Sequence, residues 1–260
     1  MPTARVNGVN IFYEDHGQGY PLVWSHEFAG DYRSWETQVR FFSRRYRVIT
    51  YSARGYPPSE VPDDPETYTQ ENAVEDLRGL LVHLEIERAH VGGLSMGGNV
   101  ALNFGIAHPE MARSLIVAGT GSGSTDPETF QRSVRDRADR MRAGGMVAMQ
   151  DYAQSSTRVQ LQRKDIKGYE EFRSQLAEHS NVGSAHTFAG VQGRRPPIFD
   201  LEPKLRALQV PTLIMTGDED DACIEPSIFM KRAIPRSGLV LFSQSGHAIN
   251  LEEPDLFNRT

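Results

Sequence analysis

The sequence predicts an α/β fold, in which a mostly parallel sheet is flanked by helices and interrupted by an inserted helical segment. Over residues 1–120, short runs rich in β-branched and aromatic residues alternate with segments of helical periodicity. Two more such runs enclose a helical segment after residue 200, and the stretch between the two parts has helical periodicity alone. Strands that alternate with helices of this length are typical of parallel βαβ units.

The first part of the chain is expected to begin with a hairpin-like segment around Asn7-Gly8, over residues 6–14. Further strands are expected, in order, at residues 21–25, 47–51, 89–92 and 114–118. The helices between them are expected at residues 34–43, 69–84 and from about 96 to 107, where His108-Pro109 ends the last one.

Residues 119–124 have loop composition, and helical periodicity alone follows to about residue 200. In its first helix Phe130, Val134 and Met141 fall on one face. The arginines of this helix are interpreted as a solvated surface and are assigned no function: Arg132, Arg135, Arg137, Arg140 and Arg142. The expected division is therefore a core of residues 1–120 and 201–260 with a helical lobe of residues 121–200.

The last part of the chain is expected to contribute strands at residues 211–216 and 239–242 around a helix at 227–233. A further helix-like segment covers residues 250–257. Together with the earlier strands, these elements complete one doubly wound sheet.

Composition narrows the classes of function. The 260 residues hold 28 Lys and Arg against 34 Asp and Glu, a formal net charge of −6 at pH 7. Because long Lys/Arg runs are also missing, neither nucleic acid nor an anionic membrane is expected as the main partner. The sequence lacks an apolar run typical of a signal peptide or a membrane span, so a cytoplasmic location is expected. A single cysteine, Cys223, excludes an intrachain disulfide and a cysteine-based zinc site, and is expected to be a small buried side chain.

Residues 93–97 read Gly-Leu-Ser-Met-Gly, the pattern G-x-S-x-G, between an expected buried strand and an expected helix. A sharp turn between the two elements would expose the hydroxyl of Ser95 and aim it. Gly93 and Gly97 would let strand and helix approach closely, because they carry no side chains. Ser95 is therefore the candidate nucleophile.

A serine nucleophile needs a base, and the chain offers eight histidines: His16, His26, His83, His90, His108, His179, His186 and His247. His247 follows an expected strand in a loop, at the edge of the sheet where the carboxyl ends of strands collect ligands. The partner of the base should be a carboxylate in a similar loop. Residues 218–221 read Asp-Glu-Asp-Asp directly after another expected strand, so Asp218, Asp220 and Asp221 are the candidates.

The chain order of serine, aspartate and histidine, with G-x-S-x-G, resembles the α/β-hydrolase family over essentially the whole chain. The resemblance implies a mostly parallel eight-stranded sheet, and makes residues 121–200 the cap over the active site. In family members the acid usually stands three residues after the glycine that closes its strand, which falls on Asp220 here. The implied triad is Ser95, Asp220 and His247, and it requires neither a metal nor an organic cofactor.

The resemblance also covers the loop that would hold the oxyanion, residues 25–30. By that match the backbone N–H groups of Phe28 and Met96 form the oxyanion hole, and His26 is a structural residue of the loop. Glu27 stands where the family usually has glycine, and its side chain is expected to point away from the oxyanion. His26 and Glu27 could begin an H-E-x-x-H zinc motif, but Gly30 stands where the second histidine would be. Residues 54–55, Arg-Gly, are similar to the family's loop after the next strand.

Family members also close with a full helix, whereas this chain stops at residue 260, so that helix is expected to be short or cut off by the end of the sequence.

The expected function is hydrolysis of a small or medium carboxylic ester or lactone through an acyl-enzyme on Ser95. Relatives with the same triad also cleave carbon–carbon bonds of ring-fission products or act as cofactor-free haloperoxidases and perhydrolases. A receptor on the same fold, which binds a small molecule without turnover, is a further alternative. A serine rather than an aspartate nucleophile argues against epoxide hydrolases and haloalkane dehalogenases. The expected partner is thus a small molecule, and the sequence leaves the oligomeric state open.

Overall fold

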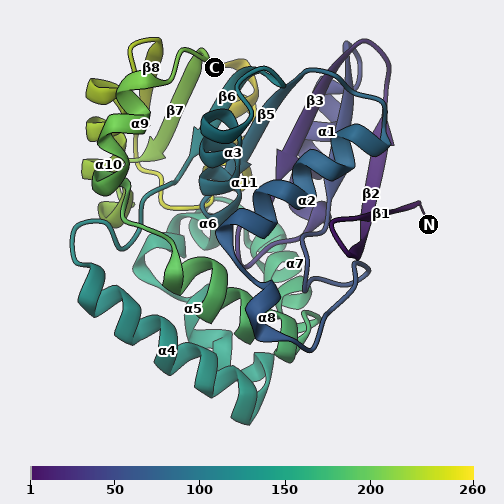
Figure 1. The fold of residues 1–260 in the computed structure, drawn as a ribbon. Helices are drawn as coiled ribbons and strands as arrows, with labels where there is room; N and C mark the ends of the chain where they lie inside the picture. The colour runs from purple at the N-terminus through teal and green to yellow at the C-terminus, as the bar shows by residue number, and fades with distance from the viewer. Residues whose placement is uncertain (1) are drawn as a thin grey trace.

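The structure, a computed structural model, describes residues 2–260 apart from the side chains of residues 148 and 150. Its centre is an eight-stranded sheet with the order β1-β2-β4-β3-β5-β6-β7-β8 (Figure 1). The strands are β1 Thr3–Val6, β2 Val9–His16, β3 Tyr20–Ser25, β4 Tyr46–Tyr51, β5 Ala89–Leu94, β6 Ala112–Ala118, β7 Thr212–Gly217 and β8 Ser237–Phe242. Only β1 and β2 join the sheet by antiparallel pairing, and β3 to β8 are parallel. The expected mostly parallel sheet is confirmed.

The register of the central strands brings their carboxyl ends together. Gly93 of β5 pairs with Ser25 of β3 on one side and with Val117 of β6 on the other. The loops that follow these three strands therefore leave the sheet at one edge, which is where ligands bind in open parallel sheets. The loops after β7 and β8 leave at the same edge, because Gly217 pairs with Phe242.

The α-helices lie between and after the strands along the chain. Their bounds are α1 Glu36–Phe42, α2 Gln70–His83, α3 Met96–Ala107, α4 Pro127–Gly144, α5 Gln150–Ala153, α6 Val159–Lys164, α7 Ile166–Ala177, α8 Asn181–Thr187, α9 Glu202–Ala207, α10 Asp221–Ala233, α11 Ile249–Glu252 and α12 Pro254–Arg259. Short 3-10 turns lie at η1 Tyr32–Trp35, η2 Pro65–Thr67, η3 Met146–Met149, η4 Ser156–Arg158 and η6 Ile198–Leu201, and a π-helical turn, η5, spans Phe188–Gln192. No helix within residues 2–260 has both the length and the apolar character needed to cross a bilayer.

Alternate residues of each strand point to opposite faces of the sheet, so two apolar layers form. One layer joins Val23, Ile49 and Val91 to apolar residues of α2, α3, α9 and α10. The other joins Leu22 and Trp24 to α1 and to the C-terminal helices. Both faces are covered, as the continuous apolar runs of the central strands require.

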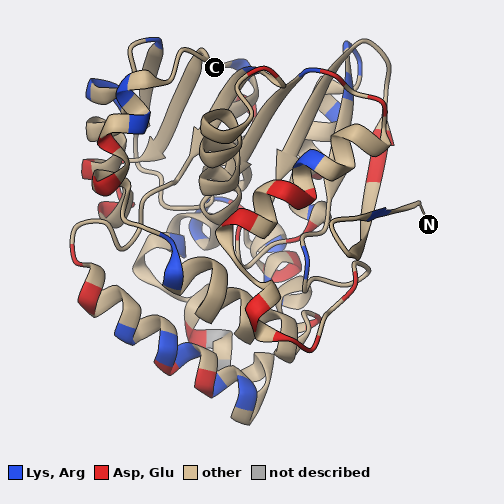
Figure 2. Cartoon of the chain, viewed as in Figure 1, with Lys and Arg blue, Asp and Glu red and all other residues tan. Residues whose placement is uncertain are grey.

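The helices of residues 121–200 gather below the sheet, across the carboxyl ends of its strands (Figure 1). Their own apolar cluster includes Val134, Met141 and Phe172, and it continues onto Phe28 and Met96 of the sheet-edge loops. The segment thus packs directly over the two residues expected to hold the oxyanion. Acidic and basic residues are interspersed along α4 (Figure 2).

Two helices differ from the sequence-based expectation. Helix α10 starts at Asp221 rather than residue 227, with Pro226 inside it. The expected start after Pro226 was wrong. That expectation followed from the usual avoidance of proline inside a helix, where it removes one backbone hydrogen bond, but α10 contains Pro226 all the same. At the C-terminus, α11 and α12 replace the single expected helix, and the break falls at Glu253, just before Pro254.

Candidate active site

Ser95 lies at the sharp turn between β5 and α3, with a φ of 57° and a ψ of −110°. A positive φ is rare for a side chain other than glycine, and it is held here by hydrogen bonds. The Ser95 N–H donates to the carbonyl of Ala118 at 2.8 Å, and the Ser95 carbonyl accepts from the N–H of Asn99 at 3.0 Å. The turn leaves Ser95 lining a hollow instead of packing into the core.

The two glycines of the turn are required sterically. A Cβ atom at Gly97 would lie 2.0 Å from the carbonyl oxygen of Ser25, and one at Gly93 would lie 2.2 Å from the carbonyl oxygen of Gly97. Because these contacts are to backbone, no side-chain rotation could relieve them. The G-x-S-x-G pattern thus allows α3 to start directly against β3 and β5.

Two backbone amides of the neighbouring loops are buried and free to donate. The N–H groups of Phe28 and Met96 find no backbone or side-chain acceptor within residues 2–260, although both residues are buried. Met96 is the first residue of α3, where helical N–H groups have no partner within the helix and the helix dipole is positive. A developing negative oxygen would satisfy both donors.

His26 determines the direction of the Phe28 N–H. The Ala53 N–H donates to His26 Nε2 at 2.9 Å, so the ring proton is on Nδ1, which donates to the Glu27 carbonyl at 2.6 Å. In a trans peptide the Glu27 carbonyl and the Phe28 N–H point in opposite directions, so holding one aims the other. Burial lowers the pKa of His26 to about 4, which keeps the ring neutral near pH 7.

His247 and Asp220 come together from the loops after β8 and β7. His247 Nδ1 lies 2.7 Å from Asp220 Oδ2, and both side chains are buried. Asp220 is ionised, because the charge of His247 and its hydrogen bond lower the pKa of the carboxyl more than burial raises it. An ionised carboxylate only accepts, so Nδ1 carries the proton and Nε2 is left to act as a base.

The other two acidic candidates lie elsewhere. Asp218 is exposed and accepts the backbone N–H of Ser245 at 3.1 Å, which fastens the two loops together. Asp221 is exposed at the start of α10. Of the three aspartates, only Asp220 contacts the imidazole of His247.

Ser95, Asp220 and His247 line one hollow under the helical segment, with about 740 Å³ of space not filled by atoms and part of it open to solvent. The hydroxyl of Ser95 makes no hydrogen bond to His247 in this structure. Such contacts are commonly long before substrate binds, and one ligand could contact both groups because both residues line the same hollow. The other residues around it are Ser122, Phe130, Ser133, Val134, Arg137, Tyr152, Ser155, Thr157, Arg158, Phe188, Gln192 and Ala222.

The activity should rise with pH through a value above 6.5, since His247 must be neutral to accept a proton. Burial lowers the pKa of His247, but the charge and the hydrogen bond of Asp220 raise it further, to a net value above the usual 6.5. In Asp220→Asn the acidic limb of kcat/KM for an uncharged ester should move to lower pH. Asp218→Asn, which removes an exposed charge nearby, should leave the limb in place. A wild-type limb at or below pH 6.5 would contradict this account of His247.

Arg158 is a site residue that the sequence did not reveal. Its guanidinium is buried, lines the hollow and donates to the carboxylate of Glu27. Glu27 was expected to point away from the oxyanion, and its side chain does not line the hollow. It does not reach solvent either, because it is buried. Arg158 stands in η4 beside Thr157, whose carbonyl accepts the His247 N–H at 2.7 Å. This short turn therefore contacts both the oxyanion loop and the histidine loop.

Asp220, Cys223 and His247 offer three ligand atoms within 4.8 Å of one another. The facing atoms of Asp220 and His247 already share a hydrogen bond. Burial and the charge of Asp220 raise the pKa of the Cys223 thiol well above its usual value, so the sulfur stays protonated. A metal ion would need a thiolate and a free carboxylate oxygen, so this donor set does not fit one.

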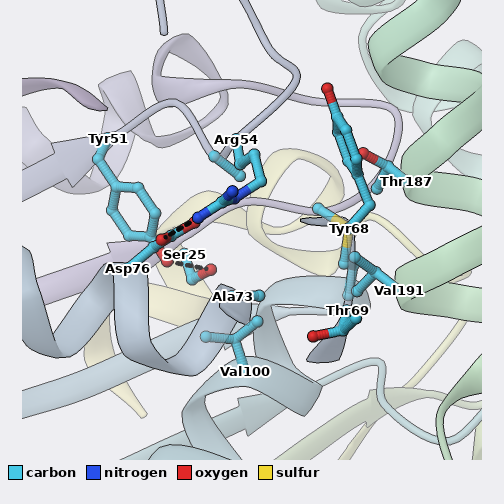
Figure 3. A pocket seen from close by; sticks show the side chains of 12 residues that line it. Ser25, Tyr51, Arg54, Tyr68, Thr69, Ala73, Asp76, Val100, Thr187 and Val191 are labelled. Carbon is cyan, nitrogen blue, oxygen red and sulfur yellow. Dashed lines mark hydrogen bonds and ion pairs between the residues drawn. The ribbon is translucent and has the colours of Figure 1, made fainter. Parts of the chain in front are cut away.

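A second hollow is lined by Ser25 and Met96 but not by Ser95, Asp220 or His247 (Figure 3). Arg54 and Asp76 form a buried ion pair on its wall, with Nη2 and Oδ1 2.7 Å apart. Tyr51 donates to Ser25 at 2.9 Å, so that serine hydroxyl is engaged. Arg54 lies in the loop after β4, which was expected to resemble the corresponding loop of the family. Its ion pair with Asp76 links this loop to α2.

Comparison with known proteins identifies the family of this chain. The alpha/beta hydrolase fold family model matches residues 20–254. The chain is 31% identical to 3-oxoadipate enol-lactonase 1 of Acinetobacter baylyi over 91% of this chain and 85% of that protein. It superposes on the enol-lactonase of Burkholderia xenovorans with a TM-score of 0.87, at 28% identity over 99% of this chain and 97% of the other.

A thermophilic esterase from Thermogutta terrifontis also matches with a TM-score of 0.87, at 28% identity over 99% of this chain and 95% of the other. The match of the family model to most of the chain and the eight-stranded sheet confirm the resemblance inferred from the sequence. This protein is therefore a hydrolytic enzyme that belongs to the alpha/beta hydrolase fold family.

Proposed function

We propose that this protein hydrolyses a small or medium carboxylic ester or lactone through an acyl-enzyme on Ser95. The observation that carries the proposal is the hollow itself. It joins a serine on a strained turn to an imidazole whose Nδ1 is fixed by Asp220. Of the two residues with unpartnered amides, Met96 directly follows Ser95 in the chain, and Phe28 packs its ring against Phe188 of the lining. The enol-lactonase and esterase relatives support an acyl substrate.

In the proposed mechanism Ser95 Oγ attacks the carbonyl carbon while His247 Nε2 takes the hydroxyl proton. The carbonyl oxygen becomes an oxyanion held by the N–H groups of Phe28 and Met96. The intermediate collapses, the bond to the leaving oxygen breaks, and His247 returns the proton to that oxygen. Water, deprotonated by His247, then attacks the acyl-enzyme. The bond from the acyl carbon to Ser95 Oγ breaks, His247 returns the proton to Oγ, and the acid is released.

Residues 121–200 would act as a cap that sets which substrates fit. Their helices supply much of the wall of the hollow, including Phe130 and Val134 from α4 and Phe188 from η5. The core, residues 1–120 and 201–260, would supply the chemistry. This division explains why the reacting groups come from loops of the sheet, whereas most of the apolar lining comes from the inserted segment.

A substrate panel tests the proposal. The panel contains p-nitrophenyl acetate, butyrate and octanoate, a five-membered and a six-membered lactone, and a ring-fission dienoate with a cleavable carbon–carbon bond. Turnover of esters or lactones, with the acid and alcohol identified as products, is the expected result. Cleavage of the dienoate alone would establish a carbon–carbon hydrolase instead. Stoichiometric binding of a panel member without any turnover would establish a receptor.

A further inference from the structure

Arg137 differs from the other arginines of α4. Solvation was the expectation for all five, yet Arg137 is partly buried and lines the same hollow as Ser95 and His247. Its guanidinium lies over the ring of Tyr152, 5.2 Å from the ring centre. Its Nη1 is buried and has no hydrogen-bond partner within the described part of the chain. A buried donor without a partner costs free energy, which a ligand in the hollow would recover.

The other charged groups around the hollow are compensated. Asp220 is paired with His247, and Arg158 is paired with Glu27. Asp151 is near enough to feel the charge of Arg137, but its carboxylate is bound to Arg140 at 3.1 Å. The wall at Arg137 therefore has an excess positive charge, although the protein as a whole is acidic.

A second half-buried arginine, Arg195, adds to this charge. Arg195 lies over the ring of Phe130 at 5.4 Å and donates to the Ser122 carbonyl at 2.9 Å. Phe130 and Ser122 both line the hollow, and Nη1 of Arg195 is also buried without a partner in residues 2–260. Among the ion pairs of residues 2–260, none joins Arg195 to a carboxylate. Its charge is therefore uncompensated and adds to the positive potential in the hollow.

We propose that the substrate is anionic and carries a carboxylate, which Arg137 binds while the ester or lactone carbonyl lies at Ser95. This inference rests on the proposed hydrolase function and names its substrate class. A guanidinium presents parallel N–H donors that match the two oxygens of a carboxylate. The hollow would then take an ester or lactone of a dicarboxylic acid, with one carboxyl group free and the other acylating Ser95. Arg195 would strengthen the attraction without touching the ligand.

The test compares two esters that differ in one carboxylate: p-nitrophenyl butyrate and mono-p-nitrophenyl glutarate. Monoesters of succinate and adipate bracket the distance from the carboxylate to the reacting carbonyl. Wild type should show a higher kcat/KM for one of the charged esters than for the neutral one. In Arg137→Gln the ratio of charged to neutral kcat/KM should fall by about 10- to 100-fold, the usual effect of losing a charge-assisted hydrogen bond.

Two controls separate this inference from the proposed function. Arg135→Gln removes the same charge from an exposed position of α4 and should keep the wild-type ratio. Monomethyl glutarate should bind Ser95→Ala, measured by calorimetry, and should bind the Ser95→Ala/Arg137→Gln double variant at least about tenfold more weakly. An unchanged ratio in Arg137→Gln, or equal binding to both variants, would overturn the inference. Hydrolysis of the neutral ester that depends on Ser95 would still uphold the proposed function in that case.

Discussion

Ser95→Ala is expected to lower kcat for ester hydrolysis by about 10⁴-fold or more, because the variant can form no acyl-enzyme. The backbone donors and the hollow would remain, so some rate above the uncatalysed reaction should persist. Substrate binding should change little, since alanine removes only the hydroxyl. Steady-state kinetics with p-nitrophenyl butyrate measures the loss.

Ser133→Ala is the matched control for this experiment. Ser133 also lines the hollow, but it stands on α4, away from the turn after β5. Its loss should leave kcat within a few-fold of wild type. If Ser133→Ala lost as much activity as Ser95→Ala, or if Ser95→Ala stayed active, Ser95 would not be the nucleophile.

Arg158→Met is expected to cause the largest loss of stability, about 3 to 5 kcal/mol in the free energy of unfolding. Methionine keeps much of the volume under Tyr152 and Phe172, whose rings contact the guanidinium. The loss arises because the carboxylate of Glu27 stays buried with no counter-charge. Urea unfolding, followed by circular dichroism, measures the change.

The double variant Glu27→Gln/Arg158→Met should recover most of this stability, because no unpaired charge remains buried. An exposed pair provides the comparison: Arg40 and Glu36 form an i,i+4 ion pair on the surface, with Arg40 77% exposed. Arg40→Met should cost no more than about 0.5 kcal/mol. A loss in Arg158→Met no greater than that of Arg40→Met would show that the buried pair does not secure the oxyanion loop.

Local signals in the sequence predicted the strands and the turn at Ser95. The G-x-S-x-G pattern is one local unit, and the clash that a Cβ atom at Gly97 would have with Ser25 shows why the pattern and the structure coincide. The choice among Asp218, Asp220 and Asp221 could not be made from periodicity, since all three follow one strand within four residues. It depends on which carboxylate faces a histidine 27 residues further along the chain.

Arg158 could not be found from the sequence, because its partner Glu27 lies 131 residues away and no local pattern joins them. Arg137 could have been found. It stands three residues after Val134 and four before Met141, the spacing of the apolar face of α4. Because Arg137 is charged, it was expected on the solvated face of the helix. Its spacing from Val134 and Met141 instead puts it on the buried face. In the proposed function, the position of the substrate would depend on such packing between residues 121–200 and the rest of the chain.

Trapping the acyl-enzyme tests the central claim most directly. Wild-type protein mixed with excess p-nitrophenyl butyrate, quenched in acid and digested, should yield a peptide that carries one butyryl group on Ser95. Ser95→Ala should yield none, and Ser133→Ala should give the same adduct as wild type. Hydrolysis of the ester with no adduct, or with a butyryl group on another residue of the hollow, would contradict the claim that Ser95 is the nucleophile.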